Sequence, residues 1–272
     1  MKYFHGVKKI LFIVYFALFF VNNSLADTKA EEREFILYAK LPIVPKISIL
    51  QISTNLIEID KEKFELKFNI KTLNIVNYIS SINGDGLVLG YIKNNNYYPE
   101  LYKYEYVRGN KEKSVYLKYS NGKINDEIFI PEYDKNKLTP ITNEQKFNTI
   151  DPATLFLRFL DINKIYGCNQ DIKIYDGKRR YDIIFSDKKF EKQEIECSAS
   201  QNRIGGYKKN KIDPLTNTDL LKIRYEDSAN NRFLGFYAKK GLIEIMIEEI
   251  HWKRSVKEFF NSLMPSPVKA LT

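Results

Sequence analysis

The sequence predicts a mainly β protein, built as a single large curved antiparallel sheet or an open half-barrel with two or three short helices. Three observations carry this prediction. Apolar and polar side chains alternate along many short segments. Two-residue turns that contain Gly separate neighbouring segments, as antiparallel hairpins need. The chain also holds 19 Tyr and 18 Phe, residues that favour a pleated sheet over a helix.

Alternation of apolar and polar residues marks the strands. It is clearest at 64–71, and Tyr102, Tyr104 and Tyr106 form an aromatic row because every second residue of a strand points to the same face. A strand of this kind has one apolar face and one solvent-exposed polar face. The other segments predicted as strands are 33–40, 46–59, 87–93, 113–120, 123–130, 170–175, 178–186, 194–203, 218–226, 232–239 and 242–252.

Turn signals lie between these strands. The Asn-Gly pair at 121–122 and the Asp-Gly pair at 176–177 suit two-residue type I′ turns, in which both central residues need a positive φ. The run Asn-Gly-Asp-Gly at 83–86 predicts a further turn before the strand at 87–93.

Two helical pieces interrupt the strands. Asp151 and Pro152 predict a helix start, since Asp caps free amide groups and Pro fits the first turn, and this helix runs to about Ile162. A weaker helical pattern covers 72–80. The segment 131–149 is rich in Pro, Lys and Asn, and we predict it as a long loop.

We predict one β-rich domain over residues 27–256, because strands lie on both sides of the long loop. A short helix is predicted at Val256–Leu263, beginning at the last residue of this domain, and with the Pro-containing tail after it makes up the segment 257–272. Two smaller domains, divided at the loop, are the alternative.

Residues 1–26 have the features of a cleavable secretory signal peptide. Three lysines form a basic start, an apolar run covers Ile10–Val21, and small residues stand at Ser24 and Ala26, the two positions that a signal peptidase reads. The rival interpretation, an uncleaved membrane anchor, needs about 18 to 20 apolar residues, more than this run holds. We therefore predict export to the periplasm and no transmembrane span in the mature chain.

The two cysteines, Cys168 and Cys197, are predicted to form a disulfide, because an exported protein matures in an oxidising compartment. A redox-active pair is the alternative. Such pairs usually have C-x-x-C spacing, which this sequence lacks.

The charge balance argues against nucleic acid as a partner. The whole chain has 43 Lys and Arg against 34 Asp and Glu, and removal of the leader with its three lysines leaves 40 against 34. Acids are interspersed among the lysines along most of the chain, which indicates a mixed solvated surface rather than a polyanion-binding face.

The sequence shows no catalytic centre, metal site or cofactor site. The mature chain keeps one histidine, His251, and too few ligands remain for zinc when the cysteines are paired. Phosphate loops and nucleophile elbows are absent. Carboxylates such as Glu244, Glu248 and Glu249 could perform acid–base chemistry, but spacing alone does not separate them from a solvated face. The sequence therefore favours a non-enzymatic protein.

The densest polar feature is the hairpin that begins at 176–177. Its residues Lys178, Arg179 and Arg180 are the predicted anion contact, since Arg can hold a carboxylate or phosphate through two parallel hydrogen bonds. The alternative is an ordinary hairpin whose cations are exposed or paired with nearby Asp side chains.

Several of these segments together resemble a known family. The run at 149–152 before an apolar helix, then Cys168, then the run at 174–182 are similar to the family catalogued as domain of unknown function 3108. The likeness extends over roughly residues 33–254. The resemblance implies an exported bacterial envelope protein with a β-rich fold. It implies no established activity, so it supplies no catalytic residues.

Three functions stay open at this point. The first is a binding module that holds an apolar or lipid-like ligand on the concave face of the curved sheet. The second is a structural or assembly partner in the cell envelope that acts by protein–protein contact, which predicts an exposed apolar patch or an unpaired sheet edge. The third and least supported is a hydrolase that uses carboxylates. The residues predicted for the ligand face, which would serve equally well as a filled core, are Phe64, Phe68, Tyr102, Tyr104, Tyr106 and Phe185.

Overall fold

A computed structural model describes residues 28–79, 81–209, 220–228 and 231–257. Thirteen strands form one antiparallel sheet in the order β7-β6-β5-β4-β3-β2-β1-β13-β12-β11-β10-β9-β8, and the two outermost strands do not pair with each other. The predicted fold, an open curved sheet with few helices, is confirmed. The predicted leader lies outside the described residues.

The elements follow one another closely along the chain. The strands are β1 (Thr28–Leu41), β2 (Val44–Ile59), β3 (Lys63–Thr72), β4 (Ile82–Lys93), β5 (Asn96–Arg108), β6 (Lys111–Ser120), β7 (Lys123–Ile130), β8 (Ile172–Tyr175), β9 (Arg180–Glu191), β10 (Glu194–Gly205), β11 (Leu220–Glu226), β12 (Phe233–Lys240) and β13 (Ile243–Lys257). The helices are α2 (Asn74–Ile79), α3 (Asn143–Lys146) and α4 (Pro152–Phe159), with short 3-10 turns η1 (Lys135–Lys137) and η2 (Ile162–Ile165).

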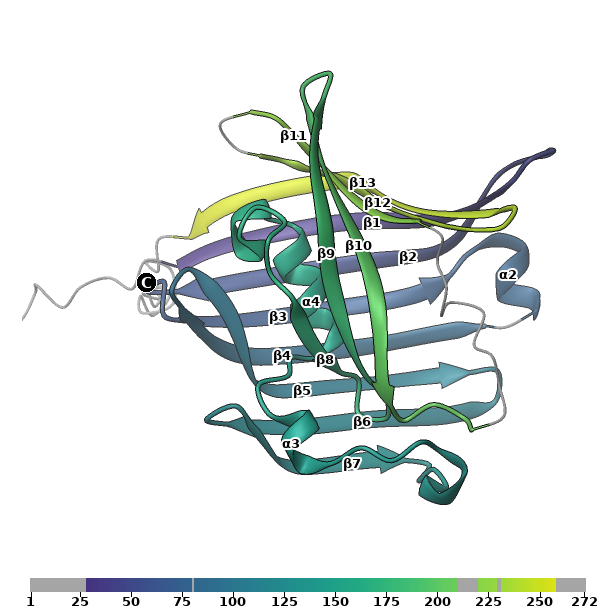
Figure 1. Ribbon diagram of the computed structural model, residues 1–272, viewed down its shortest axis with the longest axis vertical. Coiled ribbons are helices and arrows are strands. Elements are labelled where there is room, and N and C mark those ends of the chain that lie inside the picture. The colour runs from purple at the N-terminus through teal and green to yellow at the C-terminus, as the bar shows by residue number, and fades with distance from the viewer. Residues whose placement is uncertain (1–27, 80, 210–219, 229–230, 258–272) are drawn as a thin grey trace, which may run out of the picture.

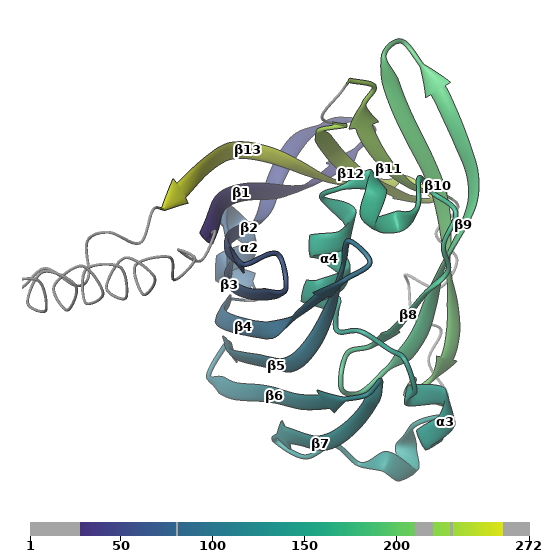
Figure 2. The same cartoon turned by 90° about the vertical axis from the view of Figure 1, so that its left-hand side faces the viewer.

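The sheet curls around α4. In Figure 1, β9 and β10 cross in front of β1 to β6, and the turned view in Figure 2 places α4 between these two parts of the sheet. The helix begins as predicted: the Asp151 carboxylate accepts hydrogen bonds from the backbone N–H groups of Ala153 (2.9 Å) and Thr154 (2.8 Å), and Pro152 occupies the first turn. Because α4 lies inside the curl, its apolar side chains form the centre of the core.

One predicted hairpin turn has the expected geometry and one does not. At the β6–β7 turn, Asn121 (φ 50°) and Gly122 (φ 74°) both have positive φ, as a type I′ turn needs. The β8–β9 connection is longer than predicted, because β8 ends at Tyr175 and β9 begins at Arg180. The Asp176 carboxylate stabilises this four-residue loop because it accepts hydrogen bonds from the backbone N–H groups of residues 178 (2.9 Å) and 179 (2.5 Å).

The turn predicted at 83–86 is wrong. These residues lie inside β4 and pair with both β3 and β5. The glycines serve side-chain packing instead of a turn: a Cβ atom added at Gly86 would overlap the ring of Phe68 on β3, and one at Gly84 would overlap Tyr106 on β5. Gly86 therefore leaves room for the ring of Phe68, and Gly84 allows the backbone of β5 to approach closely.

This packing predicts that Gly86→Ala lowers the free energy of unfolding by about 1–3 kcal/mol, the usual cost of overfilling a core. Urea unfolding of the variant and the parent protein measures the difference. Phe68→Leu added to Gly86→Ala should recover part of the loss, because the smaller side chain vacates the overlap. Equal stabilities of Gly86→Ala and the parent would contradict this role of Gly86.

The two remaining corrections concern connections. The segment 131–149 contains η1 and the short helix α3, where we predicted only loop, and α3 begins with a capping box between Thr142 and Gln145. The helix predicted at Val256–Leu263 is wrong at its first two residues, which pair with β1 as the end of β13. The rest of that predicted helix lies outside the described residues.

Candidate functional site

The concave face of the sheet is filled by α4 and by aromatic rings. Phe68 lies against Tyr102 and Tyr104, with ring centroids 6.4 and 5.5 Å apart. Phe185 on β9 meets Phe159 of α4 edge to face at 6.3 Å. Phe64, Phe68 and Tyr102 are buried, and Phe185, Tyr104 and Tyr106 are partly buried. Five of the six residues predicted as a ligand face, all but Tyr106, thus belong to a packed core, the alternative given above, and a ligand on that face stays a prediction.

The predicted anion contact lies at the seam between the two open edges of the sheet. Arg180 is buried, and its guanidinium donates to the backbone oxygens of Gln145 (2.6 Å) and Tyr181 (2.7 Å) and to Asp182 (2.6 Å). Arg179 forms an ion pair with Asp176 at 2.8 Å.

Lys178, the third residue of this group, is half-buried, and its ammonium lies 5.6 Å from the centre of the Tyr133 ring. Burial lowers the pKa of Lys178. Both arginines of the hairpin therefore bind acceptors of the protein itself, and an anion contact there stays a prediction.

The cysteine pair lies where a disulfide can form. Cys168 follows η2, Cys197 is in β10, and their Cα atoms are 5.4 Å apart. Cys197 is fully buried. A disulfide between them connects the segment after η2 to strand β10, which lies over α4.

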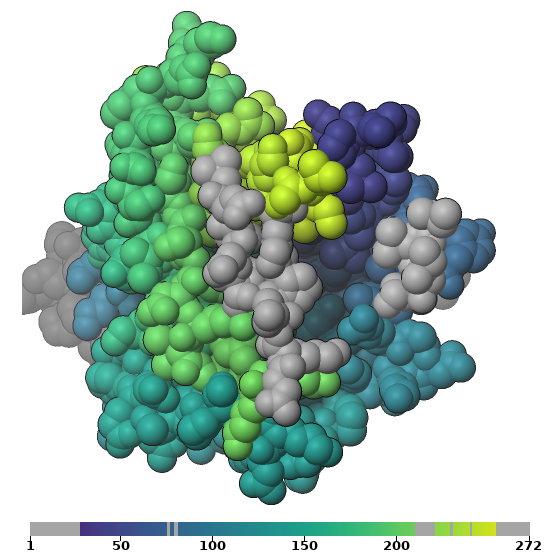
Figure 3. Space-filling view, turned by 45° about the vertical axis from the view of Figure 1, so that its right-hand side comes forward, coloured from purple at the N-terminus to yellow at the C-terminus, as the bar shows by residue number. Residues whose placement is uncertain are grey.

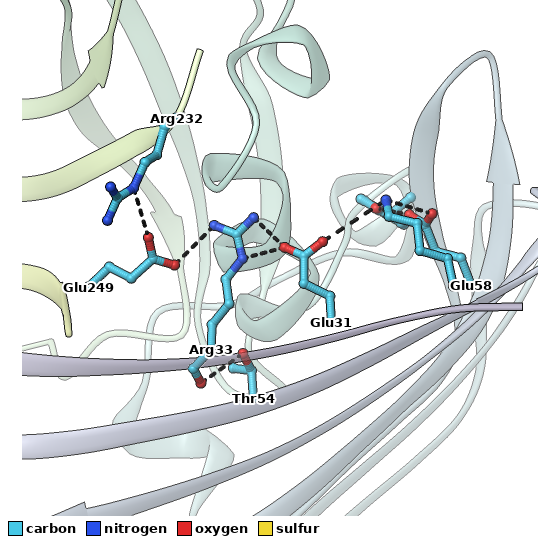
Figure 4. A network of polar contacts seen from close by, with 8 residues as sticks. Glu31, Arg33, Thr54, Glu58, Arg232 and Glu249 are labelled. Carbon is cyan, nitrogen blue, oxygen red and sulfur yellow. Dashed lines mark hydrogen bonds and ion pairs between the residues drawn. The ribbon is translucent and has the colours of Figure 1, made fainter. Parts of the chain in front are cut away.

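A chain of ion pairs crosses the inner face where β1 meets β13 (Figure 4). Arg33 contacts Glu31 and also Glu249, the latter with 3.2 Å between Nη1 and Oε1. Arg232 approaches the other oxygen of Glu249 at 3.5 Å. The Lys29 ammonium donates a hydrogen bond to the Glu58 carboxylate at 3.3 Å, and the hydroxyl of Tyr97 donates a second one to the same carboxylate. A cavity of about 300 Å³ lies beside this network.

The network neutralises buried carboxylates. The side chain of Glu249 is only 2% exposed, and burial raises its pKa while Arg33 and Arg232 oppose the shift. Arg33 lies between Glu31 and Glu249, so each of these carboxylates has a cationic partner. This arrangement suits stabilisation of the β1–β13 contact better than acid–base catalysis by a carboxylate pair.

The other candidates for chemistry lie apart from this network. Glu244 and Glu248 pair with surface lysines, and His251 is exposed. Within the residues that the structure describes, no group of three or more His, Cys, Asp or Glu side chains is placed to hold a metal ion.

Two neighbouring hairpin tips expose aliphatic side chains. Ile43, in the β1–β2 turn, is 95% exposed, and Leu242, in the β12–β13 turn, is 72% exposed. Leu41, Val44 and Ile243 beside them are also exposed. Because Lys40 of β1 pairs with Glu244 of β13, the two turns lie side by side. Figure 1 shows both hairpins projecting from one end of the sheet, and Figure 3 shows their purple and yellow surfaces in contact.

Basic residues flank these tips in the sequence. The segments 38–46 and 237–243 contain four lysines and no acid, and Glu244 and Glu248 follow directly. Glu244 contacts Lys40 (3.9 Å) and Lys239 (3.5 Å), and Glu248 contacts Lys46 (2.7 Å). Lys46 also lies 3.8 Å from the centre of the Tyr38 ring. Four lysines against two glutamates leave a positive excess of two charges in the sequence that flanks the two tips.

Sequence reasoning missed these tips, although a signal was present. Turns between strands are usually polar, whereas residues 41–45 read Leu-Pro-Ile-Val-Pro and residues 241–243 read Gly-Leu-Ile, without a charge. The proximity of the two turns had no signal, because it depends on the pairing of the first strand with the last.

The fold and these surfaces define a class: an open antiparallel sheet curled around one central helix, with exposed apolar hairpin tips at one end. The chain matches the family described as Protein of unknown function (DUF3108) over residues 38–248, and it therefore belongs to that family, as the resemblance implied. No curated protein matches the sequence.

One solved structure that is similar to the chain is the beta-barrel-like protein of domain of unknown function DUF1849 from Brucella abortus. It is 6% identical, with a TM-score of 0.45, over 85% of this chain and 99% of that one. Among the described residues, the helices are all too short or too polar to cross a bilayer.

Proposed function

We propose that the protein is a non-enzymatic, exported protein of the cell envelope that docks on an anionic lipid surface through its two apolar hairpin tips. The observation that carries the proposal is the pair of adjacent tips at Ile43 and Leu242. Exposed aliphatic groups of this kind mark interaction sites on folded proteins. The hypothesis of an envelope assembly partner that acts by protein contact predicted an exposed apolar patch, and here we propose a lipid surface in place of the protein. The filled concave face favours a surface contact over a carrier that encloses its ligand.

The shape and charge of the tips favour lipid over a protein groove. The side chains project from turns rather than from a flat face, so they can enter the boundary between headgroups and acyl chains. Removing both side chains from water contributes about 3–6 kcal/mol at most. The two excess positive charges add about 1 kcal/mol each at an anionic surface. These values give weak, reversible docking.

Export is supported by the leader and by the cysteine pair. The leader has a basic start, an apolar run and small residues at the cleavage positions. The cysteines lie at a distance that an oxidising compartment would convert into a disulfide. Both features agree with a protein that meets the outer face of a membrane after translocation.

Vesicle flotation tests the proposal. The mature protein should float with vesicles of phosphatidylethanolamine and phosphatidylglycerol, and the double variant Ile43→Asp with Leu242→Asp should lose at least about 90% of that binding, because a buried carboxylate at each tip opposes insertion. The variant should unfold at the same urea concentration as the parent, since both side chains are exposed in the folded protein.

The matched control is Phe190→Asp. Phe190 is 65% exposed near the end of β9, and Figure 1 shows the β9–β10 hairpin projecting from another side of the sheet than the two tips, so its loss should leave vesicle binding unchanged. Failure of the parent protein to bind vesicles would exclude the lipid proposal, and so would equal binding of the tip variant. Capture of an envelope protein without vesicle binding would also count against it, in favour of a protein partner.

A further inference from the structure

Arg158 is a buried cation on α4 that lines a different cavity from the one beside the ion-pair network. Its side chain is 4% exposed. The guanidinium donates from Nε (3.1 Å) and Nη2 (2.6 Å) to the backbone oxygen of Tyr97, at the start of β5. The ring of Tyr98 covers the guanidinium at 5.0 Å, and Tyr91 stacks on Tyr98 at 5.4 Å. These contacts fix the plane of the guanidinium.

The contacts of Arg158 leave much of its bonding capacity unused. A guanidinium has five N–H donors, and Tyr97 accepts two of them, which leaves three without a protein acceptor among the described residues. No carboxylate in the described part of the chain forms an ion pair with Arg158. Asp151, the buried acid that caps the same helix, already accepts hydrogen bonds from the backbone N–H groups of Ala153 and Thr154. It also accepts one from the hydroxyl of Thr154 at 2.6 Å. A buried cation without a counter-ion is costly.

A cavity of about 740 Å³ lies next to Arg158. The residue lines it together with Tyr91 and Tyr98 of the β4–β5 hairpin and with exposed side chains around the opening. These include two cations, Lys93 and Lys173, and two acids, Glu100 and Asp171, so the charges at the opening cancel. The buried charge in the cavity is therefore that of Arg158.

The cavity and the hairpin tips lie at opposite ends of the sheet. Tyr91 pairs with Lys63, next to the β2–β3 turn, whereas Val44 begins β2 at its other end. A ligand in the cavity would therefore stay accessible when the tips rest on a membrane.

We propose that this cavity binds a small molecule through an oxyanion, a carboxylate or phosphate group, held by the unused donors of Arg158. A planar guanidinium offers parallel donors that match the two oxygens of such a group. The oxyanion supplies the missing counter-ion, and the aromatic pair Tyr91 and Tyr98 forms a wall for the rest of the molecule. This site differs from the hairpin at 178–180, where protein acceptors bind the arginines.

Calorimetric titration of the full mature chain tests the site, with ionic strength held constant by sodium chloride. The probes are inorganic phosphate, glycerol 1-phosphate and benzoate. Tighter binding of glycerol 1-phosphate indicates a phospholipid headgroup, tighter binding of inorganic phosphate indicates the free ion, and tighter binding of benzoate indicates a carboxylate ligand. Each of these results supports an oxyanion site, and absence of binding by all three overturns it.

Variants locate the site. Arg158→Gln should weaken binding at least about 30-fold by removing the charge and its hydrogen bonds, and Arg158→Lys about tenfold, since it keeps the charge and loses the planar fork. Arg179→Gln, which removes an exposed arginine of the hairpin, should leave the affinity unchanged. Unchanged binding by Arg158→Gln, or loss of binding by Arg179→Gln, overturns the assignment.

A second variant covers the case in which Arg158→Gln does not fold. Lys93→Glu with Lys173→Glu changes two exposed residues at the opening and should leave the fold intact. The added negative charges should weaken oxyanion binding about tenfold at low salt, less as salt is raised. Unchanged affinity of this folded variant would contradict binding in the cavity.

Discussion

Replacing Arg33 with Met is expected to lower the free energy of unfolding by about 3–5 kcal/mol, the range measured when one partner of a buried ion pair is removed. Arg33 is the shared partner of Glu31 and Glu249 on the inner face of the sheet. Without it, the two largely buried carboxylates lose their shared cation, while Lys29 lies 4.0 Å from Glu31 and Arg232 lies 3.5 Å from Glu249. Urea unfolding at neutral pH measures the loss.

The loss should depend on pH in a definite direction. Burial raises the pKa of Glu249 above its ordinary value in the folded protein, and removal of Arg33 raises it further. A carboxyl group whose pKa is higher in the folded than in the unfolded state binds its proton more tightly when folded, so stability falls as pH rises through the folded pKa. The deficit of Arg33→Met should therefore be smaller at about pH 5 than at about pH 8.

Two further variants separate the network from the general effect of losing a charge. Arg232→Met removes a half-exposed cation from the same carboxylate, and should cost less than about 1 kcal/mol. Adding Glu249→Gln to Arg33→Met should recover part of the loss, because the buried charge disappears with its partner. A deficit independent of pH, or no recovery in the double variant, would show that packing of the Arg33 side chain dominates.

The strands could be predicted because the signal for a strand is local. At 64–71 and 113–120 the alternation alone identifies β3 and β6 within a few residues. The failure at 83–86 has a tertiary cause. Gly84 and Gly86 look like turn residues, yet they lie in a strand, where the close β5 backbone at Tyr106 and the ring of Phe68 leave no room for a side chain. No local pattern records which neighbour will cover a glycine.

The candidate sites were harder to predict for the same reason. Arg33 and Glu249 are separated by 216 residues, and they meet only because the first strand pairs with the last. Local richness in cations led to the hairpin at 178–180, but Arg180 is bound by the backbone of Gln145, from a segment expected to be a plain loop. Arg158 has no signal in the sequence that singles it out, because its contact with Tyr97 depends on where β5 begins.

Loss of the link between Cys168 and Cys197 is expected to lower the free energy of unfolding by about 3.5 kcal/mol, from the loop entropy that the link removes in the unfolded chain. The two residues are 29 positions apart. The enclosed segment includes β8, β9 and the start of β10, the strands that cover α4. Urea unfolding of the protein with and without dithiothreitol measures the effect on one sequence.

The control is the double variant Cys168→Ala with Cys197→Ala, whose stability should not respond to dithiothreitol. The source of the protein adds a second comparison. Material exported to the periplasm should show the full effect of the reductant, and material made in the reducing cytosol should show none until it is oxidised. If exported protein is as stable with reductant as without it, the cysteines contribute only packing. The covering strands must then be held over α4 by apolar contacts alone.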